Sequence, residues 1–501
     1  MKKNNRKLFS VKFFLAPFLL ALGACDANGM CCDNVESYNY YPKSADEEIG
    51  DTNSYLDIKE NRFTKASENN KSTFSMCSST EAYTNIKNLI NNGSLPNKNS
   101  VIIEQMLNYF SYSYQLNENE NLGILNEVSD CPWNSSHKLA SIAVKAKEVE
   151  SISGNLNFVF LIDVSGSMSE ELGNVKECFE TLTKKLGDND RVSIVTYANG
   201  VNTVLDGASA KDKDLITTKV NSLTASGGTN GSGGIQKAYE IAQKHFINGG
   251  NNRVILATDG DFNVGISNQG ELEDFISSKR NTGIYLTILG FGMGNYHSST
   301  AQTLARSGNG NVFYVNDRNE ARKIFTNGIA SVFEVVAKDT KTQIVFDVEQ
   351  VNTYRLLGYE NAMLTDEQFQ DEKVDAGEVL SGDVTVAMYE IELTENADLT
   401  KSLFTSDIHY KDPKTNEDKF VKNDNAIHNS NYSADFTFQS MVVEYALVLR
   451  ESKYKGDASL DHVIRMYNEN SSNYTNDEDK VGFYTLLTKT KELKQRENNQ
   501  Y

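Results

Sequence analysis

The chain has 501 residues and contains one set of side chains that suits a hard metal ion. The set combines two carboxylates with three hydroxyls: Asp163, Ser165, Ser167, Thr229 and Asp259. Oxygen ligands without sulfur or imidazole favour Mg²⁺, which prefers octahedral geometry and keeps several waters, with Mn²⁺ and Ca²⁺ as second choices. Because the hydroxyls are neutral, this shell leaves the ion under-neutralised. We therefore expect the ion to attract a further carboxylate from elsewhere.

These residues belong to three segments that are expected to meet at one edge of a parallel sheet. The first segment, an Asp-x-Ser-x-Ser motif, directly follows the apolar run 158–162, which has the composition of a strand covered on both faces. Thr229 lies in a glycine-rich loop before a predicted helix, and Asp259 follows the predicted strand 254–258. Ligands of α/β sheets bind beyond the carboxyl ends of the strands, and all three segments are predicted to lie there.

Residues 151–338 alternate between strand and helix patterns, which predicts an α/β domain with a central, doubly wound and mostly parallel sheet of Rossmann-like type. Apolar runs place strands at residues 158–162, 192–197, 254–258, 284–289 and 312–315. Apolar residues at helical spacing place helices at residues 172–186, 233–246, 299–306 and 319–336.

Two further parts flank this domain. Residues 72–150 are expected to form a smaller N-terminal α+β segment with helices around residues 86–90 and 103–110 and a strand at residues 139–144. Residues 339–501 are expected to form a C-terminal domain that is rich in β-strands and then helical. Its predicted elements are strands at 343–348, 354–359, 384–393 and 404–410, a polar loop at 411–432, a helix at 438–449 and a last helix ending near residue 494.

The N-terminus has the pattern of an export signal. Five basic residues precede an apolar run at residues 13–22, which is too short to span a bilayer comfortably. The run ends in Leu22-Gly23-Ala24-Cys25, which resembles the bacterial lipobox and implies a lipidated Cys25 after removal of residues 1–24. An ordinary cleaved signal with a coincidental cysteine is the alternative. Residues 25–71 have little apolar periodicity and are interpreted as a disordered tether.

The charge of the chain argues against a nucleic acid partner. The 49 Lys and Arg residues stand against 68 Asp and Glu residues, for a formal net charge of −19. Phosphate recognition needs the opposite balance. Loss of the five basic residues of the signal leaves 44 cations against the same 68 anions, so the mature chain would carry −24. The runs at residues 170–171 and 371–373 are interpreted as solvated faces.

The six cysteines do not form an obvious metal or redox motif. With Cys25 lipidated, five remain, so at least one thiol stays unpaired within the chain. Cys77 and Cys131 are the disulfide pair to test first. Cys178 is expected to be a small buried side chain of the helix 172–186.

The three loops resemble the von Willebrand factor type A family, whose metal-ion-dependent adhesion site consists of Asp-x-Ser-x-Ser, a later Thr and a later Asp. That resemblance implies that Ser165, Ser167 and Thr229 touch the ion directly or through water, that the two Asp residues act mostly through water, and that a partner's Glu or Asp completes the shell. Residues 158–168, 190–197, 227–234, 251–265, 289–292, 354–361, 373–378 and 454–457 resemble a bacterial subfamily of lipoproteins with this domain, a family-specific N-terminal segment and a C-terminal domain. Residues 76–79 depart from it, because the subfamily has an acidic stretch there.

The expected function is therefore that of a non-enzymatic binding module, exported to the bacterial cell envelope and anchored by lipid to the inner or the outer membrane. Its partner is a protein that presents an Asp or Glu. Asp261 and Asn263 are interpreted as solvated turn residues, with extension of the loop toward the partner as the alternative. A structural scaffold with a purely structural ion is the alternative. A Mg²⁺-dependent hydrolase is disfavoured, because no Lys follows the glycines at 226–234 and none of the six His residues lies in the three loops.

Overall fold

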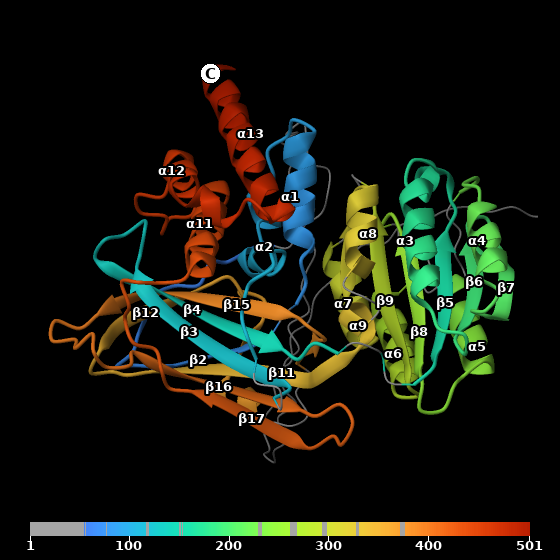
Figure 1. Ribbon diagram of the computed structural model, residues 1–501, viewed down its shortest axis with the longest axis horizontal. Helices are drawn as coiled ribbons and strands as arrows, with labels where there is room; N and C mark the ends of the chain where they lie inside the picture. The colour runs from blue at the N-terminus through green and yellow to red at the C-terminus, as the bar shows by residue number, and fades with distance from the viewer. Residues whose placement is uncertain are drawn as a thin grey trace, which may run out of the picture. The chain divides into compact units, whose positions relative to one another are not determined.

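A six-stranded sheet forms the centre of the α/β domain (Figure 1). The computed structural model describes residues 55, 57–76, 78–116, 120–149, 152, 154–228, 233–260, 268–292, 298–326, 330–370 and 376–500. The strand order is β10 (Val312–Val315), β9 (Ile284–Phe291), β8 (Asn251–Thr258), β5 (Leu156–Asp163), β6 (Arg191–Tyr197) and β7 (Val201–Ser209). All neighbours run parallel except β7, which pairs antiparallel with β6 at the edge. The predicted mostly parallel, doubly wound sheet is confirmed.

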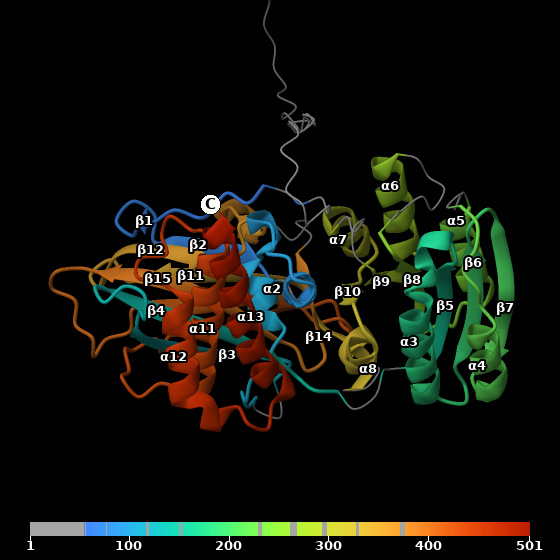
Figure 2. The same ribbon diagram turned by 90° about the horizontal axis from the view of Figure 1, so that it is seen from above.

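Helices cover both faces of this sheet, as Figure 2 shows. One face carries α3 (Leu172–Lys185), α4 (Lys213–Asn221) and α8 (Arg318–Thr326), and the other carries α5 (Gly234–Lys244), α6 (Gln269–Arg280) and α7 (Ser298–Ser307). Phe160 belongs to the core on the first face and Leu161 to the core on the second, because successive side chains of a strand point to opposite faces. Every residue of β5 is buried as a result.

The predicted helix over 319–336 is wrong only at its end, since the described residues are helical as far as Phe333. The chain forms α8, then the short α9 (Ala330–Phe333), and enters strand β11 (Val335–Phe346) at Val335. Val335 and Val336 are β-branched and fit a strand better than a helix. At this point Val335 already pairs with Leu380, which belongs to the strand Gly377–Leu380.

The strands outside the central domain form two further sheets. One has the order β1 (Thr64–Lys65), β12 (Val351–Leu357), β15 (Val384–Leu393), β4 (His137–Ala146) and β3 (Leu122–Asp130). The other has the order β13 (Met363–Leu364), β2 (Lys71–Ser75), β11, β16 (Phe404–Lys411) and β17 (Asp418–Asn423), with β14 (Gly377–Leu380) paired to β11. Phe74, Ile142, Phe346 and Tyr389 share one apolar core that draws on both sheets. Each sheet contains strands from before and after the central domain that pair with each other, since β4 pairs with β15 and β2 with β11.

A layer of helices covers the other face of the first sheet (Figure 1). It contains α1 (Glu81–Asn91), α2 (Ile103–Asn108), α11 (Ala434–Leu449), α12 (Leu460–Asn470) and α13 (Glu478–Gln500), while α10 (Asp366–Gln370) follows β13 and packs on β2 and β11. Short 3₁₀ turns occur at Lys98–Ser100, Gly166–Ser169 and Ser471–Asn473. Helix α11 is buried almost throughout because the sheet and its neighbouring helices cover it on several sides. The predicted C-terminal part, rich in β-strands and then helical, is confirmed.

Three further expectations need correction or fall outside the described residues. The tether ends earlier than predicted, because residues 63–66 already pack against β12 through β1. The expected polar loop at 411–432 contains β17, whose backbone pairs with β16 although its side chains are half exposed. Cys131 is a buried free thiol, so the proposed pairing with Cys77 is wrong, and Cys77 itself lies outside the described residues.

Cys178 is buried in the first core of the central domain, as predicted. Cys25 lies outside the described residues. In the part of the chain that the structure covers, no helix combines the length and the apolar character needed to cross a bilayer.

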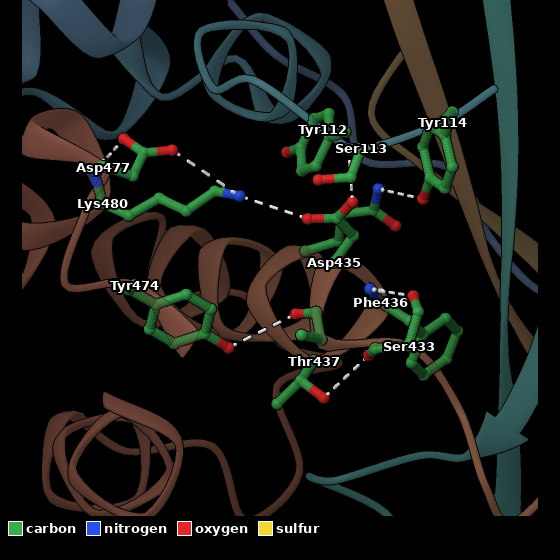
Figure 3. A network of polar contacts seen from close by, with 12 residues as sticks. Tyr112, Ser113, Tyr114, Ser433, Asp435, Phe436, Thr437, Tyr474, Asp477 and Lys480 are labelled. Carbon is green, nitrogen blue, oxygen red and sulfur yellow. Dashed lines mark hydrogen bonds and ion pairs between the residues drawn. The ribbon is translucent and has the colours of Figure 1, made fainter. Parts of the chain in front are cut away.

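A buried ion pair joins three segments of the helical layer (Figure 3). The ammonium of Lys480 on α13 lies 3.1 Å from a carboxylate oxygen of Asp435, in the first turn of α11. The second oxygen of Asp435 accepts the backbone N–H of Ser113 at 2.6 Å. The rings of Tyr112 and Tyr474 stand within 6.0 Å of the ammonium. The pair therefore fixes the start of α13 and the segment after α2 to the start of α11.

Separating this pair is expected to destabilise the fold. Asp435→Ala leaves the Lys480 ammonium buried with only Asp477 at 3.7 Å, which predicts a loss of about 3 kcal/mol or more in the free energy of unfolding. Lys491→Met removes an exposed pair between α13 and Asp461 of α12 and is expected to cost less than about 1 kcal/mol. Urea unfolding followed by the fluorescence of Trp133, the single Trp, measures both variants. Equal losses would contradict the assignment.

Candidate metal centre

The Asp-x-Ser-x-Ser segment forms a tight turn at the carboxyl end of β5. Asp163 is the last residue of the strand, and its Oδ1 accepts the backbone N–H of Ser165 at 2.8 Å. The hydroxyls of Ser165 and Ser167 are 3.1 Å apart. Asp163 and Ser165 are buried and Ser167 is exposed, so the side-chain oxygens of the turn extend from the protein interior to the surface. Three of the five predicted side chains are thus brought together within one turn.

The glycine-rich loop is fastened to this turn by its backbone. The N–H of Gly166 donates to the carbonyl of Gly227 at 2.9 Å, and the N–H of Ser226 donates to the carbonyl of Val164 at 2.8 Å. The N–H of Gly228 donates to the side-chain oxygen of Asn199 at 2.8 Å. Thr229 follows Gly228 directly but lies outside the described residues, as do Asp261 and Asn263.

Asp259 reaches the same edge from the neighbouring strand. It follows β8, which runs parallel to β5 with Ala257 beside Ile162. Asp259 is 9% exposed, and its negative charge helps to raise the pKa of Asp163. The structure therefore brings Asp163, Ser165, Ser167 and Asp259 to one edge of the sheet.

The electrostatics of Asp163 favour a cation. Burial is the main effect that raises the pKa of Asp163, to about 6, and the hydrogen bonds from Ser165 oppose it. The Oδ2 atom is buried and forms no hydrogen bond of normal geometry with the residues that the structure describes, although the buried Tyr197 hydroxyl, which is also without such a bond, interacts with the Asp163 carboxyl and helps to lower its pKa. A buried carboxylate oxygen without a partner costs free energy, and a bound cation would offset that cost. The donor set, with its hard oxygens, fits Mg²⁺.

No group of three His, Cys, Asp or Glu side chains converges to hold a metal ion within the described part of the chain. A cage of carboxylates or imidazoles is thus not what this edge offers, and the hydroxyls of the predicted set are needed. Each of the five described histidines pairs with a carboxylate elsewhere: His137 with Glu390, His245 with Asp206, His409 with Asp418, His428 with Asp130 and His462 with Glu444.

Sequence reasoning missed four residues around this edge. Tyr197, at the end of β6, is buried beside Asp163, and burial followed by the charge of Asp163 raises its pKa well above the ordinary value. Asn199 holds the glycine-rich loop. Glu171 and Gly292 border Asp259: a Cβ added to Gly292 would lie 3.4 Å from Cγ of Glu171 and 3.7 Å from Cβ of Asp259. Only the strand order could have indicated these neighbours, since they come from separate parts of the sequence.

Glu171 is not the solvated side chain that was expected. Burial raises its pKa, a hydrogen bond from Asn174 to Oε2 at 2.9 Å lowers it, and the charges of Glu170 and Asp259 raise it further. Glu170 remains exposed, as predicted.

Comparison with known proteins assigns each part of the chain to a family model. Residues 157–327 match the model "von Willebrand factor type A domain", residues 49–141 match "von Willebrand factor", and residues 331–493 match "Uncharacterized protein YfbK, C-terminal". The chain is 32% identical over 437 residues to the uncharacterized protein YfbK of Escherichia coli K12, covering 82% of this chain and 76% of the relative.

Two more distant similarities cover smaller or more divergent parts. The uncharacterized protein sll0103 of Synechocystis is 26% identical over 174 residues, covering 34% of this chain and 40% of the relative. A solved structure titled von Willebrand factor type A from Catenulispora acidiphila shares 16% identity, with a TM-score of 0.40, and covers 72% of this chain and 89% of that one.

The packing of the two loops predicts a glycine requirement at position 227. Gly227 has a φ of +87°, and a Cβ there would approach Nδ2 of Asn199 to 2.4 Å. We expect Gly227→Ala to lower the free energy of unfolding by about 2 kcal/mol, from left-handed backbone strain and the displaced Asn199. A Cβ on nearby Gly200 meets nothing within 4 Å, so Gly200→Ala should change stability by less than about 0.5 kcal/mol.

Urea unfolding of both variants tests this requirement. The double variant Asn199→Ala/Gly227→Ala removes the collision and keeps the strained φ, so it separates the two causes. Matching stabilities of Gly227→Ala and Gly200→Ala would show that the loop is not held as described.

Proposed function

Because the chain belongs to the bacterial family of von Willebrand factor type A proteins that carry a YfbK-type C-terminal domain, we propose that it is a metal-dependent binding module. In this proposal a divalent ion, Mg²⁺ or alternatively Mn²⁺ or Ca²⁺, is held by five side chains, and a protein partner contributes an Asp or Glu carboxylate. The five are Asp163, Ser165, Ser167, Thr229 and Asp259.

The buried Oδ2 atom of Asp163 is the observation that carries this proposal. It lies in the turn that also presents the Ser165 and Ser167 hydroxyls, 3.1 Å apart. Asp163 and Asp259 supply two negative charges that would act mostly through water, while the hydroxyls of the serines and Thr229 would touch the ion without neutralising it. A bound ion would supply an electropositive position for the partner's carboxylate.

A purely structural ion is the less favoured alternative. The two loops are already joined by backbone hydrogen bonds from Gly166 to Gly227 and from Ser226 to Val164, so an ion is not required to tie them together. A hydrolase is also less favoured. The five described histidines are paired with carboxylates on other elements, which leaves no described imidazole as a general base near Ser165 or Ser167.

We further propose that the module is exported and anchored to a membrane of the bacterial cell envelope through Cys25. The support is the sequence of residues 1–25, with its basic start, its short apolar run and its lipobox-like end. Two or more acyl chains give stable attachment without a membrane-spanning segment. A mature charge of −24 keeps the folded body away from anionic head groups, so the lipid would be the main attachment.

Metal binding is expected to depend on the predicted side chains. Isothermal titration of Mg²⁺ or Mn²⁺ should give a saturating signal for the wild-type chain and at least about tenfold weaker binding for Asp163→Ala and Thr229→Ala, because each removes an oxygen from the shell. Asp188→Asn serves as the control, since Asp188 is exposed beyond the opposite end of the sheet, before β6. Identical titrations from all four proteins would refute the metal centre.

The same variants test the use of the ion. In a pull-down from envelope extract, the wild type and Asp188→Asn should retain a partner that EDTA releases, and Asp163→Ala should not retain it. A partner that stays bound in EDTA and to Asp163→Ala would favour the scaffold over the binding module.

Lipidation is tested by labelled palmitate in a bacterial host. The wild-type chain should incorporate the label and sediment with membranes, whereas Cys25→Ala should lose both properties. Cys31→Ala changes a nearby cysteine of the same segment and should keep both. Label on Cys25→Ala equal to that on the wild type would exclude Cys25 as the acylated residue.

A further inference from the structure

A third carboxylate borders the candidate centre without joining its ligand set. Glu171 precedes α3 directly and is half buried. Gly292, at the end of β9, separates it from Asp259, because a Cβ on Gly292 would lie 3.6 Å from Oε1 of Glu171 and 3.7 Å from Cβ of Asp259. Since Gly292 has no side chain, Glu171 and Asp259 both border the space beside its Cα atom, and the charge of Asp259 acts on Glu171.

Glu171 is not positioned as a ligand of the same ion. Among the described residues, Asp163, Asp259 and Glu171 do not form a group that could hold one metal. Oε2 of Glu171 accepts a hydrogen bond from the neutral amide of Asn174 at 2.9 Å, which leaves the negative charge in place. Glu171 is therefore a charged neighbour of the centre.

No cation of the chain neutralises this charge in the described structure. Arg318 comes within 3.7 Å of a Cβ added to Gly173, but it is not among the groups whose charge acts on Glu171. The loop segments 229–232, 261–267 and 293–297 contain neither Lys nor Arg. The charges that act on Glu171 come from Glu170 and Asp259, and both are acidic.

The edge thus combines two unmet demands. The buried Oδ2 atom of Asp163 has no hydrogen-bond partner of normal geometry, so a cation in the centre would stabilise it. The negative charge of Glu171 would be stabilised by a second positive charge beside the centre. A partner's carboxylate bound at the ion would lie beside the negative Glu171. A second negative charge on the partner would be repelled there, and a positive charge would be attracted.

We propose that Glu171 selects the partner, so that the site recognises a carboxylate with a cationic side chain next to it, and Glu171 pairs with that cation. This inference rests on the proposed function. It restricts the proposed partner from any protein with an exposed acidic group to one in which a Lys lies next to the Asp or Glu.

The chain offers a matched control for this role. Glu171→Gln removes the charge and keeps an oxygen that can accept the Asn174 hydrogen bond. Glu170→Gln removes the same charge from the adjacent residue, which is exposed. Comparison of the two variants thus separates the effect of losing one negative charge anywhere in this turn from the effect of losing it beside Gly292.

The experiment uses the full mature chain loaded with Mg²⁺ and blocked tetrapeptides displayed on a surface. The probes are Ser-Asp-X-Ser and Ser-X-Asp-Ser with X as Lys, Gln or Glu, and Ser-Asn-Lys-Ser as the peptide without a carboxylate. Wild type and Glu170→Gln should bind the Lys peptides about fivefold more tightly than the Gln peptides, and the Glu peptides most weakly. Within each of the two peptide orders, Glu171→Gln should bind the three Asp peptides with affinities within about twofold, and EDTA should abolish every one of these signals.

Three outcomes are distinguishable. Loss of the Lys preference in Glu171→Gln, with its retention in Glu170→Gln, supports the role of Glu171. Binding that EDTA reverses, but with the same preference in both variants or with none in the wild type, overturns the role of Glu171 and leaves the metal-dependent module intact. Absence of EDTA-sensitive binding to every Asp peptide overturns the module and this inference together.

Discussion

The burial of the Asp163 carboxylate at the end of β5 is the constraint on which the candidate centre depends. Strand β5 lies between β6 and β8 and is buried along its whole length, so the residue that ends it leaves the core while still surrounded by protein. An ionised carboxylate there is costly unless it is paired. The turn offsets part of the cost through the Ser165 N–H, which bonds only one oxygen. The remaining oxygen is the one that the proposed cation would pair.

The rest of the molecule holds this edge by connecting segments that are distant in sequence. The central domain is inserted between β4 and β11, and strands from before and after the insertion pair with each other in the same two sheets. The helical layer also contacts α8 of the central domain directly. Lys87 of α1 lies 3.4 Å from Glu320, and Asp479 of α13 lies 2.7 Å from Lys323. These sheets require pairing across more than 200 residues, as between Lys145 and Val384, so the flanking parts cannot complete their sheets independently.

The parts of the fold that were predicted from sequence are those in which burial dictates composition. The apolar run of β5 and the helical spacing of α3 are consequences of burial on two faces and on one face, respectively, and both elements were found. Strands β7 and β17 were missed because they are half-exposed edge strands, ordered by backbone pairing with β6 and β16, and their side chains therefore lack a clear alternation. Helix α6 was missed because only a few of its side chains, such as Leu272 and Ile276, reach the core.

Distance along the chain decides which residues of the centre can be recognised from the sequence. Asp163, Ser165 and Ser167 are neighbours in the chain, but Tyr197, Glu171 and Gly292 become neighbours only once the strands are ordered. Their effect is also local: at physiological ionic strength charges are screened over about 8 Å, so the −19 net charge spread over the surface acts weakly on a bound group. Glu171 and Asp259 both lie within 4 Å of a Cβ added to Gly292 and so fall inside that range. Under the proposed function, discrimination between partners at this edge would come from these few carboxylates, while the overall acidity of the chain would govern its approach to other acidic surfaces.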